Sequence, residues 1–285
     1  MAQAPLQRLI SDRKFRGCAD RNPVCFVLRT FLLDAILLPL MLYRKSTLRI
    51  LLALIFLSFF GTLTLSASML PQSYDWRYRV ISSLLSPRDN PDHYWLAAVG
   101  LGLSGLLTLP LIEYLRRYLK TIAPRTARVS AGAFILGIIA LVSAGFVVPQ
   151  HADAAFEIEQ LHEFLGRSAA GFLAIGMLCA CWCTWKGQPS FALPWIWSAV
   201  TVLPLAGLFV SKGLLVLTHL EPSWAAPIRA ALRDSVFWHL GFWEWTGAVG
   251  VFVFLCAAVF LIPAHAQGTA PPRTEGISNS TSSRA

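Results

Sequence analysis

The sequence has few charged residues. Asp, Glu, Lys and Arg make up 14% of the 285 residues, whereas a soluble globular chain carries about 25%. Hydrophobic residues make up 55% and the mean hydropathy is +0.57, which excludes an ordinary soluble domain. Cysteine is also scarce, with six residues, which excludes a disulfide scaffold. Because apolar runs of about 20 residues recur along the chain, the composition predicts a multi-pass membrane protein.

Six stretches are long and apolar enough to cross about 30 Å of hydrocarbon as helices. They lie at about 50–70, 95–113, 129–148, 163–185, 191–217 and 238–263. Only helices and closed barrels satisfy their backbone groups in lipid, and these stretches are too long for barrel strands. We therefore predict an all-α fold, a polytopic transmembrane helical bundle with six spans.

Two further segments flank the predicted membrane domain of residues 50–263. Residues 1–49 form a basic region whose first part has no apolar core, so we expect no cleavable signal peptide. Within it, residues 26–43 are apolar but are interrupted by Arg29, Asp34 and Pro39. We predict an N-terminal helix lying in the cytoplasmic interface, with a re-entrant or spanning segment as the alternative. Residues 264–285 are small and polar and predict a disordered tail.

The net charge of +9 is divided unevenly between the two faces of the predicted bundle. With the N-terminus inside, 17 of 24 basic residues fall on the inner face and 10 of 15 acidic residues on the outer face. Because cytoplasmic loops carry an excess of Lys and Arg, we predict that both termini are cytoplasmic, in the inner membrane of a cell. The positive charge then reports orientation, so membrane lipids are the expected partners and nucleic acid is not.

Histidine is concentrated toward the predicted outer side. Five of the six residues lie there, namely His93, His151, His162, His219 and His239. Three of these, His162, His219 and His239, lie at the outer ends of three different spans, at a depth similar to that of Glu163 and Glu244. The three imidazoles could therefore converge on one outward-facing pocket.

Such a layer has several chemical uses. His162, His219 and His239 could hold a divalent metal such as Zn²⁺, with His162, His239, Glu163 and Glu244 as the catalytic groups of a hydrolysis. Two histidines on facing helices could instead ligate a haem, or the layer could relay protons or bind a headgroup. The sequence contains no HExxH spacing, and histidines are also ordinary at a wet interface, so these alternatives stay open.

Two cations lie inside predicted spans. Lys212 precedes the outer end of the fifth span, where an ammonium either snorkels to water or pairs with a carboxylate. Glu163 and Glu244 are the expected partners by depth. Arg167, one turn into the fourth span, is expected to join the same network.

The predicted outer loop, residues 71–94, departs from the positive-inside pattern. Its sequence is PQSYDWRYRVISSLLSPRDNPDHY, and the segment SPRDNP within it predicts turns. Arginine suits the recognition of phosphate or carboxylate, so we predict that a lipid headgroup or another anion binds here. The predicted ligand-binding residues are Asp75, Arg77, Arg79, Ser82, Arg88, His93, Arg167 and Lys212. The alternative is that the arginines pair with local aspartates and that the loop is a folded cap over the bundle.

A family resemblance rests on several short motifs. The run ISSLLSPRDNP, the Gly-rich GLGLSGLL, a short basic inner loop and His162 at the start of a small-residue span follow one another. This order resembles the uncharacterised six-helix membrane family known as domain of unknown function 998. More distantly, the chain is similar to Frag/DRAM/Sfk-type membrane proteins, which carry an Ile-Ser element in the first outer loop.

The resemblance covers about residues 50–260, and Ile81, Ser82, Pro87 and His162 match family-like positions. The runs YDWRYR and FWHLGFWEW have no counterpart in the family pattern. The resemblance implies a six-helix fold and leaves the activity open.

The sequence therefore predicts a membrane protein with an outward-facing polar pocket that binds or processes a lipid or another anionic ligand at the outer leaflet. A non-enzymatic transporter, sensor or assembly factor is the alternative. A b-type haem protein is the third candidate.

Overall fold

The computed structural model describes residues 44–70, 72–147, 156–187, 192–219 and 235–262, with positions 224, 227, 228, 230 and 231. This part of the chain is all-α and contains six helical stretches that are long and apolar enough to cross a membrane. The chain is therefore a multi-pass membrane protein, as predicted. The interfacial helix predicted over 26–43 and the tail predicted over 264–285 lie outside the described residues.

The first span consists of three consecutive helical segments. They are α4 (Lys45–Phe56), the π-helix η1 (Leu57–Gly61) and α5 (Thr62–Ser68). The other five spans are single helices. These are α7 (Tyr94–Ile122), α8 (Pro124–Phe146), α9 (Phe156–Gly187), α10 (Ala192–His219) and α12 (Leu240–Leu261). Two short helices, α6 (Ser82–Leu85) and η2 (Val236–Trp238), precede α7 and α12.

The observed ends of the helices differ from the predicted ends. α7 continues to Ile122 instead of ending near 113, because Arg116, Arg117 and Lys120 favour helix and their long side chains reach water while the backbone stays helical. α8 begins at Pro124 instead of near 129, since proline fits the first turn, where no helical N–H bond is lost. Hydropathy locates the apolar part of a helix, and the helix itself extends beyond it.

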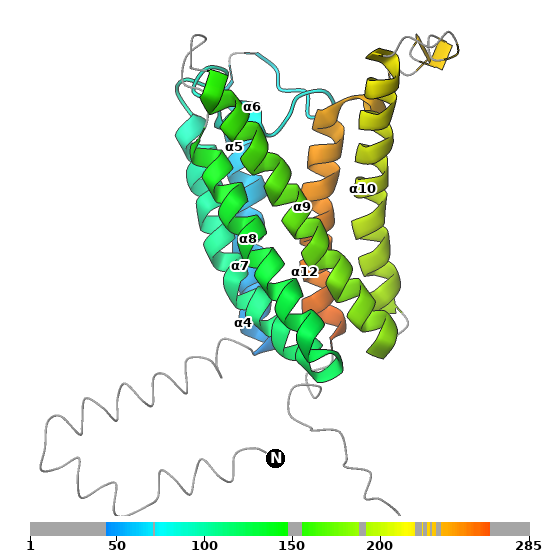
Figure 1. The fold of residues 1–285 in the computed structure, drawn as a ribbon. Coiled ribbons are helices and arrows are strands. Elements are labelled where there is room, and N and C mark those ends of the chain that lie inside the picture. The colour runs from blue at the N-terminus through cyan, green and yellow to red at the C-terminus, as the bar shows by residue number, and fades with distance from the viewer. Residues whose placement is uncertain are drawn as a thin grey trace, which may run out of the picture.

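The spans form a ring of neighbouring helices (Figure 1). α4 and α5 lie against α7, α7 against α8, α8 against α9, α10 against α12, and α12 against α4; α9 also reaches α10. We call the end that holds the start of α4 and the α7–α8 turn the basic end, and the end that holds residues 72–93 the loop end.

Side chains from all six spans meet in one buried cluster in the half of the bundle near the basic end. Its largest fully buried members are Tyr114, Tyr118, Phe134, Trp197 and Phe254. Trp197 stacks on Phe254 with ring centroids 4.3 Å apart, and its indole N–H donates to the Phe254 carbonyl at 3.0 Å. The second cluster, nearer the loop end, draws its buried members from α5, α6 and α7 alone. They are Leu63, Leu84, Leu85, Ala97, Ala98 and Leu101.

α9 and α10 approach one another toward the basic end and diverge toward the loop end (Figure 1). Near the basic end, the Trp185 indole donates to Ser198 at 3.0 Å, and the Cys181 sulfur lies 3.7 Å from the Thr201 hydroxyl. Beyond Thr201, none of the described side chains at 202–211 is buried, and Phe209 is 83% exposed. We call α9 residues 161–178 and α10 residues 202–211 the diverging halves.

Candidate functional site

The segment after α5 folds back over the start of α12, and Tyr74 lies at the centre of this contact. Its hydroxyl donates toward the carbonyl oxygens of Arg79 and Val80, both 3.1 Å away, and accepts a 3.2 Å hydrogen bond from the Trp245 indole. Burial raises the pKa of Tyr74, so the hydroxyl remains a donor at neutral pH. A Cβ at Gly241 would lie 2.5 Å from the Arg79 oxygen, so the absence of a side chain there permits the close approach.

Two predicted catalytic residues take part in the same contact. Glu244 Oε2 accepts a 2.8 Å hydrogen bond from the Ile81 backbone N–H. The His239 ring meets the Tyr78 ring edge-on, with centroids 4.6 Å apart. His239, the residue before α12, and Glu244 within α12 therefore fix the loop to the last span.

The predicted turn at 86–91 is confirmed, and it is built around Asn90. This residue is 1% exposed, and its side-chain amide donates to the Ser66 hydroxyl at 2.7 Å and to the Leu84 carbonyl at 3.1 Å. Its own backbone N–H donates to the Ser86 carbonyl at 2.8 Å. The backbone carbonyl of His93, the residue before α7, accepts from Ser66 at 3.4 Å. Asn90 was not among the predicted site residues, although an Asn between two prolines is a turn signal.

Asp75 and Arg77 form a two-pronged ion pair on the loop surface. Arg77 Nε and Nη2 donate to the two Asp75 oxygens at 3.0 and 2.9 Å, and the Arg77 backbone N–H donates to the same carboxylate at 3.0 Å. These bonds lower the pKa of Asp75. The pair borders an open hollow of about 410 Å³ that residues 73–77 line.

The other predicted loop residues are also bound locally. Arg88 lies 3.5 Å from Asp89, Arg79 donates to the Gln72 amide oxygen at 3.0 Å, and Ser82 opens the helix α6. The loop is therefore folded locally, and Arg77 and Arg88 pair with aspartates; anion binding by this loop stays a prediction.

His162 closes the end of α8. Its Nδ1 lies 3.0 Å from the Ala144 carbonyl oxygen and 2.9 Å from that of Val147. A carbonyl oxygen only accepts, so Nδ1 carries the proton and donates to these carbonyls at the end of the helix. The neighbouring Glu163 forms an ion pair with Arg167 one turn later; the network predicted around Lys212 stays a prediction, because the side chain of Lys212 lies outside the described part of the chain.

The three predicted metal ligands differ in how far the structure describes them. His162 contacts the end of α8 and His239 contacts Tyr78, so these two imidazoles have separate partners on separate helices. The side chains of His219 and Lys212 lie outside the described part of the chain. Among the described residues, no group of three His, Cys, Asp or Glu side chains could hold a metal ion. Neither the zinc nor the haem prediction gains support from these positions.

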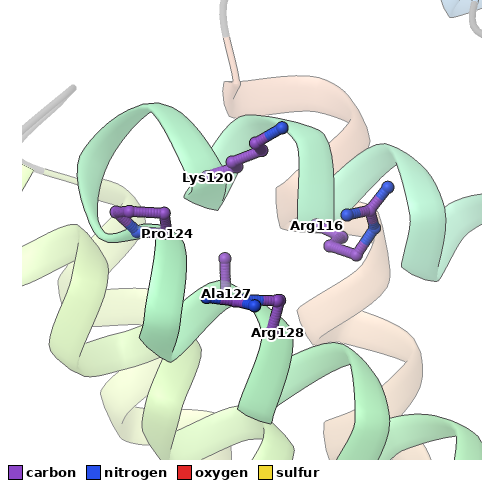
Figure 2. A pocket seen from close by; sticks show the side chains of 5 residues that line it. All are labelled: Arg116, Lys120, Pro124, Ala127 and Arg128. Atoms are coloured by element: carbon purple, nitrogen blue, oxygen red, sulfur yellow. The ribbon is translucent and has the colours of Figure 1, made fainter.

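A second concentration of charge lies at the basic end. Arg116 and Lys120 from the end of α7, and Pro124, Ala127 and Arg128 from the start of α8, surround a hollow of about 200 Å³ (Figure 2). None of these side chains is among the predicted site residues. In the sequence, the cations among them indicated only the orientation of the bundle in the membrane. The i, i+4 spacing of Arg116 and Lys120 was the available signal.

Glu113 is the carboxylate that pairs with cations at this hollow. It accepts from Arg116 at 2.6 and 2.7 Å and from Arg117 at 2.9 Å. Lys120, Arg125 and Arg128 form no ion pair with the described residues.

Comparisons with protein-family models, with curated proteins and with solved structures found no match to this chain. The resemblance of residues 50–260 to the uncharacterised six-helix family stays a prediction.

Proposed function

We propose that the chain binds an anionic lipid from the outer leaflet of a cell's inner membrane, between the diverging halves of α9 and α10. The observation that carries the proposal is that these two helices meet at Cys181 and Thr201 but separate toward the loop end, where none of the described side chains at 202–211 is buried and Ile175 and Leu178 on α9 are exposed. Lipid fills any space that membrane helices leave open.

Apart from Glu163 and Arg167, the exposed surface of the diverging halves is apolar. Ile175 and Leu178 on α9 and Val202 and Phe209 on α10 are all exposed, and a Cβ added to Gly171 would meet nothing within 4 Å. Acyl chains fit such a surface, since they require no hydrogen-bonding partner. A soluble ligand gains less there than a lipid does.

Arg167, which is ion-paired with Glu163, borders this surface near the loop end. Arg167 is exposed and lies 14 positions before Cys181, close to a whole number of helical turns. Position 212 lies 11 residues after Thr201, which is again close to whole turns and returns to the same row of α10. Arg167 and Lys212 therefore occupy the helix rows that meet at Cys181 and Thr201. This placement supports an anionic headgroup at the outer edge of the surface.

The loop end is the outer side in this proposal. The basic end holds Arg44, Lys45 and Arg49 together with the cations of the α7–α8 turn, and cytoplasmic segments carry such an excess. The acidic residues Asp75, Asp89 and Asp92 lie at the other end. Both termini are then cytoplasmic.

Binding is better supported than catalysis. His162 donates to backbone carbonyls, Glu244 accepts from a backbone N–H, and His239 packs on Tyr78. Each of these groups has a structural partner, and the described residues present no cavity into which they converge. A lipid-binding transporter, sensor or assembly factor therefore fits the geometry better than a hydrolase does.

The test uses the purified full chain in phosphatidylcholine nanodiscs that contain a trace of photoreactive phosphatidylglycerol. Illumination is expected to label peptides from 161–178 and 202–211 above the level found on α5 and α12. Arg167→Gln should lower this labelling about fivefold, since a charge near the membrane surface contributes about 1 kcal/mol. Photoreactive phosphatidylcholine should label the same peptides less.

Arg88→Gln is the matched control, because it removes an exposed cation from the same end without touching α9 or α10. Its labelling pattern should equal that of the unmodified chain. Even labelling around all six spans, or equal labelling by the two lipids, would contradict the proposal.

A further inference from the structure

We propose a second lipid site at the opposite end of the bundle, where the α7–α8 turn binds the phosphate of an anionic phospholipid. The site is the hollow of about 200 Å³ that Arg116, Lys120, Pro124, Ala127 and Arg128 surround (Figure 2). It shares no residue with the outer surface described above.

The charge around the hollow is strongly positive. Residues 113–128 contain five cations and one carboxylate, that of Glu113. Glu113 already binds Arg116 and Arg117, so Lys120 and Arg128 face the hollow with no ion-pair partner among the described residues. Membrane-protein pockets with this charge, at the end of the bundle, are suited to phospholipid headgroups.

The start of α8 adds to the positive potential. The helix begins at Pro124 after Ala123, and no side chain caps its first turn. Its first backbone N–H groups therefore point outward without an intrahelical acceptor, and a helix N-terminus favours an anion. The hollow combines this terminus with cations from a second helix, which a lone helix end does not provide.

The surface next to the hollow selects a lipid over a free phosphate ion. Leu106 and Leu109 on α7 and Val129 and Leu136 on α8 are exposed large apolar residues on the membrane side of the cations. A Cβ added to Gly132 would meet nothing within 4 Å. Acyl chains along this strip would place their phosphate at the level of Lys120 and Arg128.

The tight turn at Ala123 explains why the site is preformed. The Ala123 N–H donates to the Leu119 carbonyl at 2.9 Å and its own carbonyl accepts from Ala127 at 2.9 Å. One residue thus closes α7 and opens α8, which holds Lys120 and Arg128 on adjacent helix ends.

The test measures the affinity of dioleoyl phosphatidylglycerol for the detergent-purified full chain by native mass spectrometry. Lys120→Gln with Arg128→Gln should weaken binding about thirtyfold, since each cation near a membrane surface contributes about 1 kcal/mol. The control, Arg44→Gln with Lys45→Gln, removes the same charge from the same end of the bundle and should change the affinity less than threefold. Equal losses in the two double variants would overturn the proposal.

Competition with inorganic phosphate distinguishes a site for a phospholipid headgroup from a site for a free phosphate ion. Millimolar inorganic phosphate should leave phosphatidylglycerol bound if the acyl chains contribute as proposed. Displacement of the lipid by inorganic phosphate would overturn the lipid site in favour of a soluble anion. Mapping with photoreactive phosphatidylglycerol on the unmodified chain tests the location without any variant. Labelling should fall on peptides spanning 106–136, and its absence there would also overturn the proposal.

Discussion

The half of the bundle near the basic end and the half near the loop end are held together in different ways. Near the basic end, all six spans contribute to one buried cluster, and Trp197 is 0% exposed within it. Near the loop end, α9 and α10 diverge (Figure 1), and the loop contacts α12 through hydrogen bonds of Tyr74 and Glu244. One half is closed by packed side chains and the other by a polar cap.

This difference follows from the membrane as a solvent. Lipid tails are as apolar as leucine, so helices gain little from burying apolar surface against one another and rely on close packing and hydrogen bonds. The basic half packs closely through ring stacking and small residues. The loop half lacks such packing between α9 and α10, which leaves surfaces that a lipid can contact.

The largest expected effect is at Trp197. Trp197→Ala removes the ring stacked on Phe254 and the bond to its carbonyl, which should cost about 3–5 kcal/mol of unfolding free energy. Phe209→Ala, in the diverging half of α10, should change it by less than about 0.5 kcal/mol. Reversible unfolding in mixed detergent and dodecyl sulfate micelles measures both. Comparable losses would show that the two halves are packed alike.

The next effect concerns the polar cap. Glu244→Ala leaves the Ile81 N–H without its acceptor, and a hydrogen bond to a charged group contributes about 1.5–3 kcal/mol. Amide exchange of the peptide containing Ile81 should therefore accelerate by about tenfold or more. Glu244→Gln keeps an acceptor oxygen, so its amide exchange rate at Ile81 should lie between those of the unmodified chain and of Glu244→Ala.

Glu163→Gln is the control for this experiment, since Glu163 pairs with Arg167 on α9 and not with the loop. It should leave exchange at Ile81 unchanged. If Glu244→Ala also leaves it unchanged, the contacts of Tyr74 with Trp245 and of Tyr78 with His239 hold the loop to the last span without Glu244.

The six spans could be predicted because the length of an apolar run is set by the thickness of the bilayer. Their ends could not, since α7 continues through Arg116, Arg117 and Lys120 in a region where hydropathy has already fallen. Hydropathy indicates whether a residue contacts lipid or water, whereas helix propensity decides where the helix ends.

The depth of the candidate site residues could be predicted, but their partners could not. His162 and His239 both lie near the loop end, as the charge count predicts, yet one contacts α8 and the other contacts Tyr78. The position of a side chain around the bundle depends on which helices are neighbours, and the sequence of a single span does not determine that order. The hollow of Lys120 and Arg128 likewise depends on the tight turn at Ala123.

A smaller effect compares two glycines on α9. A Cβ at Gly176 would lie 2.9 Å from the Phe134 ring, whereas a Cβ at Gly171 meets nothing within 4 Å. Gly176→Ala should therefore destabilise the fold by about 1–2 kcal/mol through overpacking. Gly171→Ala should be neutral or stabilising by up to about 1 kcal/mol, because alanine favours helix. The same micelle assay measures both, and a destabilising Gly171→Ala would place a protein contact where we find open space.

The smallest effect is the pH response of the loop surface. Arg77 lowers the pKa of Asp75 in the folded chain, so the pair's contribution is fully present above the ordinary carboxyl pKa of about 4 and is lost as pH falls through the lowered value. Trp76 fluorescence should therefore change reversibly below about pH 4, while Asp75→Asn should remove that change. Only the part of the change that Asp75→Asn abolishes belongs to the pair. Nine other tryptophans remain in a W76F variant, so the same titration of W76F should lose the reversible change, and its persistence would mean that the response comes from tryptophans elsewhere in the bundle.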